Sequence, residues 1–517
     1  METTRPSEAN EVSLFGTRLE AAKPATRKLV TGRPRLKPIN RQQLLMRSID
    51  VEKLIESDHP ARAIWEMLGQ VDLSRFEEGI QAVEGRAGQA TVSPRLLAAL
   101  WIYSCSEGIS SARELSRMCE YEPGCQWLTG METINHHTLS DFRVEHKDAL
   151  DGLFIQVLGL LSVEGLVDLK QVTQDGTKIK ANAGKDTFRR EERVKQHLAM
   201  AREQIQAMED PRSEVLTQRV ARARERALRE KKQRLEFALE ELKRVQESKP
   251  EKEKTEARVS LTDPQARVMK TGEGGWAPSY NVQVCTDTAQ GIIVDVAATQ
   301  AGNDRDQLSP AINRLQQRVG SPEQILTDTA YVSHGSIETA VKEGIDLIAP
   351  VANAVPDPQQ YERRGIGSGF HAEAFRYEAG QNQYVCPADK ILKCTGKQRY
   401  AGRIKWRYQA APSECQRCRF KDQCCPTVKS RRITRSEDSP AVKAFLSKME
   451  TPEAKETYRK RGPVAEFVNA WLKEKLGLRQ FRLRGLAKVQ IECLWVSLTY
   501  NIQQWIRLRW RSRFATA

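Results

Sequence analysis

The sequence predicts a mixed α/β protein with an all-α N-terminal domain. Residues 41–165 carry repeated helix-start signals and no alternating pattern. From about residue 168, apolar and polar residues alternate as they do in β-strands, and strand signals then alternate with helical ones up to residue 350. Beyond residue 440 the pattern is helical to the end. We therefore expect a mixed sheet flanked by helices, preceded and followed by helical segments.

The overall charge narrows the class of partner. The 517 residues include 82 Lys and Arg against 67 Asp and Glu, a formal net charge of +15. Such a surface suits a polyanion, because neutralising phosphates releases their counterions. Charge alone leaves nucleic acid, ribosomes and membrane surfaces open. The stretch METTRPSEANEVSLFG has no signal-peptide core, and LFIQVLGLLSVEGLV is too interrupted to span a membrane. We expect a cytoplasmic, nucleoid-associated protein without membrane contact.

The N-terminal part contains a basic arm and then short helices. Residues 1–40 mix Pro, Thr, Lys and Arg without a sustained apolar period, which predicts a flexible arm. In residues 41–165, Ser93-Pro94 provides an N-cap with Pro at the first helical position. Two capping boxes follow, at Ser111-x-x-Glu114 and Thr138-x-x-Asp141. Short helices with tight turns are typical of helix-turn-helix DNA-binding domains. The alternative is a helical bundle used for dimerisation.

The middle of the chain combines strands with a charged insertion. The stretch VDLKQVTQDGTKIKANA alternates across Gly176, which predicts a β-hairpin. Residues 186–256 carry two apolar stripes separated by EDPRSE, which predicts an antiparallel helical hairpin. This insertion would be a dimerisation or DNA-clamping arm, or only a solvated hairpin. Strand signals return in SYNVQVCTDT and GIIVDVAATQ, and the order of elements up to residue 350 predicts the mixed sheet.

Three carboxylates stand out as a candidate metal site. Asp175 and Asp328 each end a predicted strand, and acids that end adjacent strands lie on one rim, where ligands gather. Taken singly, each aspartate could instead be a structural turn residue, because Asp before Gly or Thr is common in turns. Glu466 opens an amphipathic helix, where it could simply complement the helix dipole. Together, three acids on converging elements would bind Mg²⁺, and two such ions promote in-line phosphoryl transfer.

Four sequence blocks carry a resemblance to a known family. QDGTKIKANA, SYNVQVCTD, TDTAYVS and the stretch from YRKRGPVAEFVNAWLKEKLG to FRLRGL resemble blocks of DDE transposases from bacterial insertion sequences. The closest group is the one numbered eleven-eighty-two, and the resemblance covers roughly residues 45–505. It implies a ribonuclease-H-like catalytic domain with a triad of Asp175, Asp328 and Glu466 that binds Mg²⁺ or Mn²⁺ as a pair of ions.

The resemblance also implies a reaction and its partners. DNA would be cleaved at the element's terminal inverted repeats, and the freed ends would be transferred to a target DNA. A homo-oligomer, such as a dimer, would assemble on the DNA. Two alternatives remain open: a nuclease of the same fold without strand transfer, and an inert DNA-binding or repressor protein derived from a transposase.

The family's signature helix is written Y-x2-R-x3-E-x6-K. Tyr458 and Arg461 keep the first spacing, and Glu466 and Lys473 keep the last. Four residues, rather than three, separate Arg461 from Glu466, and the extra residue falls where Gly462-Pro463 is expected to interrupt the helix. The resemblance implies that Lys473 holds a DNA phosphate while Tyr458 and Arg461 position the strand, and Arg461 is the member that departs from the pattern.

Residues 380–430 form a Cys-rich insertion, because six of the eleven cysteines lie there. Clustering of this kind indicates a metal site in a reducing compartment rather than a disulfide framework. The spacing Cys415-x2-Cys418 is that of zinc sites. We expect structural Zn²⁺ on Cys386, Cys415, Cys418 and Cys424, with Cys425 or Cys394 as substitutes. The alternative is a reduced loop with cysteines in a small core. Basic residues between the cysteines indicate that the insertion faces DNA.

The last segment, residues 440–517, contains the final helices and a basic tail. WIRLRWRSRF interleaves four arginines with Trp505, Trp510 and Phe514. These aromatics either stack on nucleic acid or pack as one face of an amphipathic helix. The predicted catalytic domain thus comprises residues 166–350 and returns in 440–517, with insertions at 186–256 and 380–430.

Overall fold

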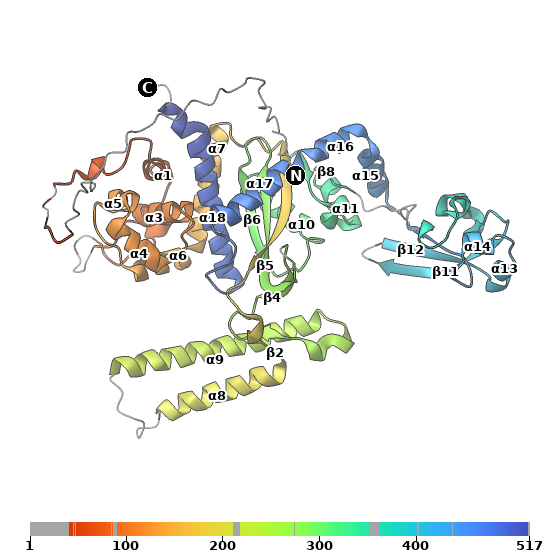
Figure 1. The fold of residues 1–517 in the computed structure, drawn as a ribbon, viewed down its shortest axis with the longest axis horizontal. Coiled ribbons are helices and arrows are strands. Elements are labelled where there is room, and N and C mark those ends of the chain that lie inside the picture. The colour runs from red at the N-terminus through yellow and green to blue at the C-terminus, as the bar shows by residue number, and fades with distance from the viewer. Residues whose placement is uncertain are drawn as a thin grey trace, which may run out of the picture. The chain divides into compact units, whose positions relative to one another are not determined.

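The computed structural model describes residues 41–44, 46, 48–83, 85, 90–209, 218–272, 274–350, 361–400, 403–436 and 438–514. The chain divides into two compact units, residues 1–49 and 50–517, and every element below belongs to the second. The predicted basic arm of residues 1–40 lies outside the described residues. Figure 1 labels the elements as they are named here.

The N-terminal part is helical, as predicted. Its helices are α1 (Pro60–Leu68), α2 (Ser74–Glu77), α3 (Pro94–Ser106), α4 (Ala112–Tyr121), α5 (Pro123–Thr129), α6 (His136–Glu145) and α7 (Lys147–Val163). The Ser111 side chain caps α4 by accepting a hydrogen bond from the backbone N–H of Glu114. The predicted start at Thr138 is wrong. Asn135 caps α6 by accepting from the N–H of His137, so Thr138 lies inside the helix.

A mixed sheet forms the centre of the second unit, as predicted. Its strands are β1 (Gln171–Lys180), β4 (Arg267–Lys270), β5 (Trp276–Asp287), β6 (Ile293–Thr299), β7 (Gln324–Leu326) and β8 (Asp346–Ile348). β1 pairs antiparallel with β5 on one side and parallel with β7 on the other. β6 and β4 pair antiparallel with β5, and β8 pairs parallel with β7. The helices α10 (Leu308–Arg318) and α11 (His334–Lys342) follow β6 and β7.

The predicted hairpin at Gly176 is wrong, because β1 runs through Asp175 and Gly176 as one continuous strand. Both residues pair with β5. The glycine serves close packing rather than a turn: a Cβ atom on Gly176 would lie 2.3 Å from Asp304 Oδ1 and 2.6 Å from Gln283 Nε2. Asp175 therefore lies in the middle of a central strand and not at the end of a short one.

The charged insertion is the predicted helical hairpin. Helices α8 (Glu191–Glu209) and α9 (Gln218–Glu247) run side by side in Figure 1. Gln246 hydrogen-bonds to Glu191 and Arg202 to Glu236, so the residue numbers run in opposite directions and the pair is antiparallel. The hairpin has its own core, made of Val194, Leu198, Ala201, Leu235, Ala238, Leu242, Ala257 and Val259. The short strands β2 (Phe188–Arg189) and β3 (Val259–Ser260) pair at its base.

The Cys-rich region contains a sheet that periodicity did not reveal. Its strands are β9 (Arg376–Glu378), β10 (Gln383–Val385), β11 (Ile391–Tyr400), β12 (Arg403–Ala410) and β13 (Arg432–Ser436). They follow one another as an antiparallel meander. Two short helices, α13 (Pro412–Gln416) and α14 (Lys421–Cys424), lie between β12 and β13. Lys and Arg on these strands mask the alternation that marks a half-buried strand.

The C-terminal part is helical, as predicted, with α15 (Pro440–Glu450), α16 (Pro452–Arg459), α17 (Arg461–Glu474), α18 (Leu486–Trp505) and the π-helical turn η8 (Ile506–Trp510). In the tail, Trp505 Nε1 donates to the Glu164 carboxylate and Trp510 Nε1 to Glu66. Both indoles are buried, which favours the packed alternative over stacking on nucleic acid. None of the described helices combines the length and apolar character that a membrane crossing requires.

Candidate active site

Asp175 lies in β1, and Asp328 lies two residues beyond the end of the neighbouring strand β7. The parallel pair β1 and β7 places Thr173 opposite Leu326, and each aspartate follows its strand residue by two positions. Asp328 itself lies beyond this pairing, as the N-cap residue of the 3₁₀-helix Thr329–Tyr331. The Asp328 side chain also accepts a hydrogen bond from the N–H of Ala330, which fixes the turn after β7. The register of β1 and β7 therefore places the two acids at corresponding backbone positions.

Two side chains of α17 hold Asp175. Arg461 Nη2 donates to Asp175 Oδ1 at 2.8 Å, and Asn469 Nδ2 donates to Oδ2 at 2.8 Å. Arg461 and Asn469 are eight residues apart, which is about two helical turns and places them on neighbouring parts of one face. The Oδ1 atom of Asn469 is buried and has no hydrogen-bond partner among the described residues. The helix therefore lies against β1 with Asp175 between its two donors.

The surroundings of Asp175 perturb its ionisation. Burial raises the pKa of Asp175 above the usual value, and the Arg461 guanidinium opposes this rise. The negative charges of Asp328 and Asp304 raise the pKa further, so these acids lie within electrostatic reach of Asp175. Functional sites typically contain a carboxyl group of this kind, whose pKa is raised by burial and lowered again by one neighbouring cation.

Glu466 and Lys473 lie on the helix that contacts Asp175. Glu466 is exposed and precedes Asn469 by three residues, so it is one helical turn away. Lys473 is half-buried near the end of the helix, one turn after Asn469. The signature residues Glu466 and Lys473 thus flank, on one helix, the amide that holds Asp175.

The helix break falls elsewhere than expected. α16 ends at Arg459 and α17 begins at Arg461, so the interruption is at Lys460. The expectation that Gly462-Pro463 breaks the helix is wrong, because proline is tolerated in the first turn, where its missing N–H has no intrahelical partner. Tyr458 therefore lies on a different helix from Arg461, half-buried against the main core. Arg461, the residue that departs from the family spacing, is the one in direct contact with Asp175.

Asp304 is a member of this neighbourhood that sequence reasoning missed. It lies in the loop between β6 and α10, and its Oδ1 accepts hydrogen bonds from Asn281 Nδ2 at 2.6 Å and Gln283 Nε2 at 2.7 Å. Its Oδ2 lies 3.4 Å from Lys178 Nζ. The run AGNDRD around it has the composition of an ordinary turn, so no local signal distinguishes this acid.

The donor set around Asp175 fits a hard cation. Asp175, Asp328 and the unpartnered Oδ1 of Asn469 offer oxygen atoms, the ligand type that Mg²⁺ and Mn²⁺ prefer. Across the described ranges, no group of three or more His, Cys, Asp or Glu side chains is gathered closely enough to hold a metal ion. The residues therefore match the chemistry of a divalent-metal site without being collected around one point.

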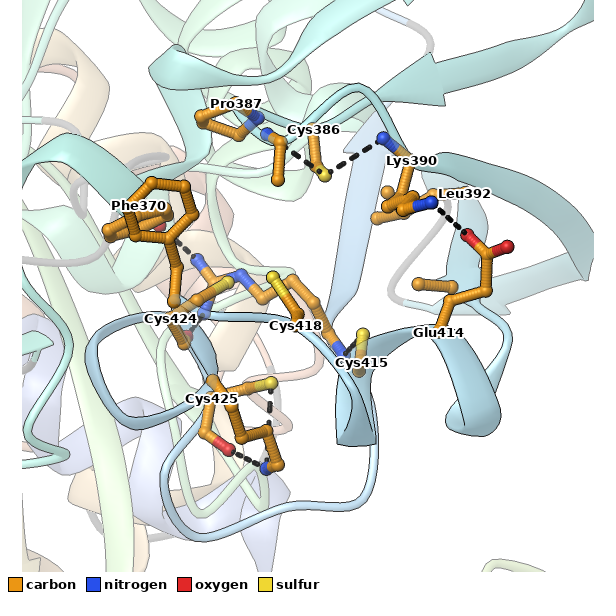
Figure 2. Close-up of a pocket in the computed structure, with 15 residues that line it drawn as sticks. Phe370, Cys386, Pro387, Lys390, Leu392, Glu414, Cys415, Cys418, Cys424 and Cys425 are labelled. Carbon is orange, nitrogen blue, oxygen red and sulfur yellow. Dashed lines mark hydrogen bonds and ion pairs between the residues drawn. The ribbon is translucent and has the colours of Figure 1, made fainter.

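The cysteines of the insertion gather around a separate cavity of about 20 Å³ (Figure 2). Those that line it are Cys386, Cys415, Cys418, Cys424 and Cys425. Cys394 packs against the small core of the sheet, as Cys386, Cys415 and Cys424 also do, but it does not line the cavity. The four cysteines proposed as zinc ligands and the substitute Cys425 are thus brought together, whereas the substitute Cys394 does not line the cavity.

Two parts of the chain match transposase families. Residues 49–145 match the family described as Transposase domain (DUF772), and residues 385–506 match the family described as Transposase DDE domain. The second match includes α17 and Glu466, whereas Asp175 and Asp328 lie outside both. No curated protein matches the chain.

A solved structure of the piggyBac transposase synaptic complex with hairpin DNA is similar at 9% identity and a TM-score of 0.32, over 88% of this chain and 75% of that one. The two family matches are to a DUF772 transposase domain near the N-terminus and to a DDE transposase domain towards the C-terminus.

Proposed function

We propose that the protein is a DDE transposase of the insertion-sequence type, which cleaves DNA at the ends of its own element and joins the freed ends to a target. The observation that carries the proposal is the contact between α17, inside the DDE-family segment, and Asp175 on the central strand beside Asp328. The strand order β6-β5-β1-β7-β8, antiparallel up to β1 and parallel beyond it, supports a ribonuclease-H-like catalytic domain.

In this proposal Asp175, Asp328 and Glu466 hold a pair of Mg²⁺ or Mn²⁺ ions. When bound, such ions activate the attacking oxygen and stabilise charge on the phosphoryl group. The chain's own residues prepare the site. Arg461 favours the ionised form of Asp175 despite burial, and Asn469 fixes the orientation of that carboxylate.

The remaining signature residues act on the DNA. Lys473, one turn beyond Asn469, holds a phosphate next to the scissile bond, and Tyr458 positions the strand from α16. Most of the rate enhancement comes from positioning and electrostatic stabilisation, because phosphoryl transfer requires little covalent participation by the protein.

The rest of the chain serves DNA binding in this proposal. The net charge of +15 supports attraction to polyanionic DNA. The helical N-terminal domain, which carries the DUF772 match, recognises the terminal inverted repeats. The protein acts as a homo-oligomer, in the simplest case a dimer, on DNA in the bacterial nucleoid.

A DNA cleavage assay tests the proposal. The full chain is incubated with Mg²⁺ and a labelled duplex that carries the inverted repeat flanking its gene. Nicking at the repeat end followed by joining to a second DNA is the expected result. Nicking without joining would replace the proposal by a nuclease of the same fold, and binding alone would replace it by an inert DNA-binding protein.

Variants connect the assay with the site. Asp328→Ala should abolish nicking and joining while DNA binding persists, because only the carboxylate is lost. Asp306→Ala, in the exposed loop after β6, is the matched control and should leave all three activities unchanged. Nicking by the Asp328→Ala protein would disprove the assignment of the catalytic acids.

A further inference from the structure

The cavity in the Cys-rich region is lined by cysteines that have no role in the proposed DNA cleavage and joining. It is lined by Cys386 from the turn after β10, Cys415 and Cys418 from α13 and the loop after it, and Cys424 and Cys425 from the end of α14. Its volume of about 20 Å³ is enough for one water-sized particle. Figure 2 shows the five labelled cysteines arranged around this common space.

Backbone N–H groups point at two of these sulfur atoms. Cys386 Sγ accepts hydrogen bonds from the N–H groups of Ala388 at 3.4 Å and Lys390 at 3.3 Å, and Cys415 Sγ accepts one from the N–H of Arg431 at 3.5 Å. N–H donors stabilise a thiolate, which is the form that binds metal. The tight turn after Cys386 and the chain before β13 are therefore already arranged as the outer hydrogen-bonding layer that orients metal ligands.

The sheet around the cavity has little else to hold it together. The buried apolar residues of this region form two small clusters: Phe375, Leu392, Tyr408, Ala410 and Ile433 in one, and Tyr361, Ile366 and Phe370 in the other. Small modules with so few core residues ordinarily depend on a disulfide or a structural metal. All eleven cysteines are free thiols. A metal is therefore the cross-link that this composition favours.

We propose that Cys386, Cys415, Cys418 and Cys424 bind one structural zinc ion, which fastens α13 and α14 to the turn between β10 and β11. Four thiolates select Zn²⁺ over hard cations such as Mg²⁺, and a closed set of four sulfurs leaves no open position for catalysis. The inference does not depend on the proposed transposase activity.

The fifth cysteine is assigned a different role. Cys425 is almost wholly buried, at 2% exposure, and its Sγ lies 3.7 Å from Lys421 Nζ. It lines the cavity with the Lys421 ammonium beside its sulfur, and we assign it no metal bond. In the described residues no three metal-binding side chains are gathered closely enough to hold an ion, so the proposal requires the four sulfurs to move inward on binding, as in sites whose formation is coupled to folding.

Zinc content of the full chain, purified under reducing conditions, tests the site. About one zinc ion per chain is expected, because one tetrahedral set is present. Cys415→Ser should lose the metal, whereas Cys394→Ser should keep it, because Cys394 lies in the same region without lining the cavity. Cys425→Ser should also keep it. Wild-type protein that binds no zinc after incubation with Zn²⁺, or zinc that is unaffected by Cys415→Ser, would overturn the proposal.

Two further measurements cover variants that fail to fold. Co²⁺ bound to the wild-type protein should show the intense thiolate-to-metal absorption of a tetrahedral sulfur site, and its absence would overturn the ligand set. Loss of zinc from the Cys425→Ser protein but not from the Cys424→Ser protein would also overturn the proposed ligand set. In limited trypsinolysis, a chelator should increase cleavage within residues 361–436 at least tenfold. Unchanged cleavage of zinc-depleted protein would show that the ion has no structural role.

Discussion

Arg461 and Asp175, 286 residues apart in the sequence, form a hydrogen-bonded ion pair with 2.8 Å between Nη2 and Oδ1. Only 11% of the arginine side chain and 22% of the aspartate side chain are exposed. The pair therefore joins α17 to the central strand and compensates a buried carboxylate at the same time. This contact makes a predicted catalytic acid and the signature helix one structural unit.

Replacing Arg461 by Gln should destabilise the protein and change its pH dependence. Burial raises the pKa of Asp175, and loss of the opposing cation should raise it further. A carboxyl whose pKa is higher in the folded than in the unfolded protein favours folding while it is protonated. This contribution is complete below the unfolded-state pKa and is lost as the pH rises through the folded-state pKa. The variant should therefore be less stable than wild type by about 3 kcal/mol at pH 7, and the difference should shrink on acidification.

Urea denaturation of the metal-free proteins between pH 4 and pH 8 measures this difference. Arg459→Gln is the matched control, because Arg459 pairs with Glu456 on the surface, with 77% and 66% of the side chains exposed. Such exposed pairs contribute at most about 1 kcal/mol. A difference between Arg461→Gln and wild type that stayed constant with pH would show that Asp175 is not the group that Arg461 compensates.

Gly176→Ala should disturb the centre of the site. The added methyl group would overlap Asp304 Oδ1 and Gln283 Nε2, at 2.3 Å and 2.6 Å. Overpacking of this kind costs about 1–3 kcal/mol, and it should also lower DNA cleavage because Asp175 is the adjacent residue. Gly159→Ala, in α7 with no atom within 4 Å of the new Cβ, should instead raise stability by about 0.5–1 kcal/mol. Thermal unfolding of both variants measures these changes, and a Gly176→Ala protein as stable as wild type would show that close packing does not require the glycine.

Glu466→Gln should remove cleavage while DNA binding remains. If Glu466 is the third metal-binding acid, its neutral isostere should lower the cleavage rate by more than about a hundredfold. Glu474→Gln is the control on the same helix, where Glu474 pairs with Arg479 at the surface. Single-turnover cleavage at saturating Mg²⁺ gives the comparison, and equal rates for the two variants would remove Glu466 from the triad.

Glu241→Ala should destabilise the junction between the helical hairpin and the sheet. The Glu241 side chain is fully buried and pairs with Arg267 on β4 at 2.7 Å, and Gln300 Nε2 donates to it at 3.3 Å. Removing one partner of a buried ion pair costs about 3–5 kcal/mol, because the other charge stays uncompensated. Glu236→Ala, whose partner Arg202 is exposed, should cost less than about 1 kcal/mol in the same urea titration.

Local patterns were sufficient for much of the fold. The apolar stripes of α8 and α9 and the alternation in β5 and β6 predicted the observed elements, because periods of 3.6 and 2 residues are properties of the chain itself. Local patterns failed where the same sequence pattern is compatible with two different structures. Asp-Gly between alternating residues is typical of a hairpin, yet at Asp175-Gly176 the strand continues, since the small residue is required by a neighbour from the loop after β6.

The sequence by itself determined the element types, the basic charge, the cysteine spacing and the choice of Asp175, Asp328 and Glu466 as candidates. Only the tertiary structure decided that Arg461 and Asn469 hold Asp175 and that Asp304 lies nearby. The physical reason is the distance along the chain over which each kind of interaction acts. A helix or strand signal arises within a few residues, whereas the ionisation of a buried carboxylate depends on charges and donors that the fold brings together from hundreds of residues away.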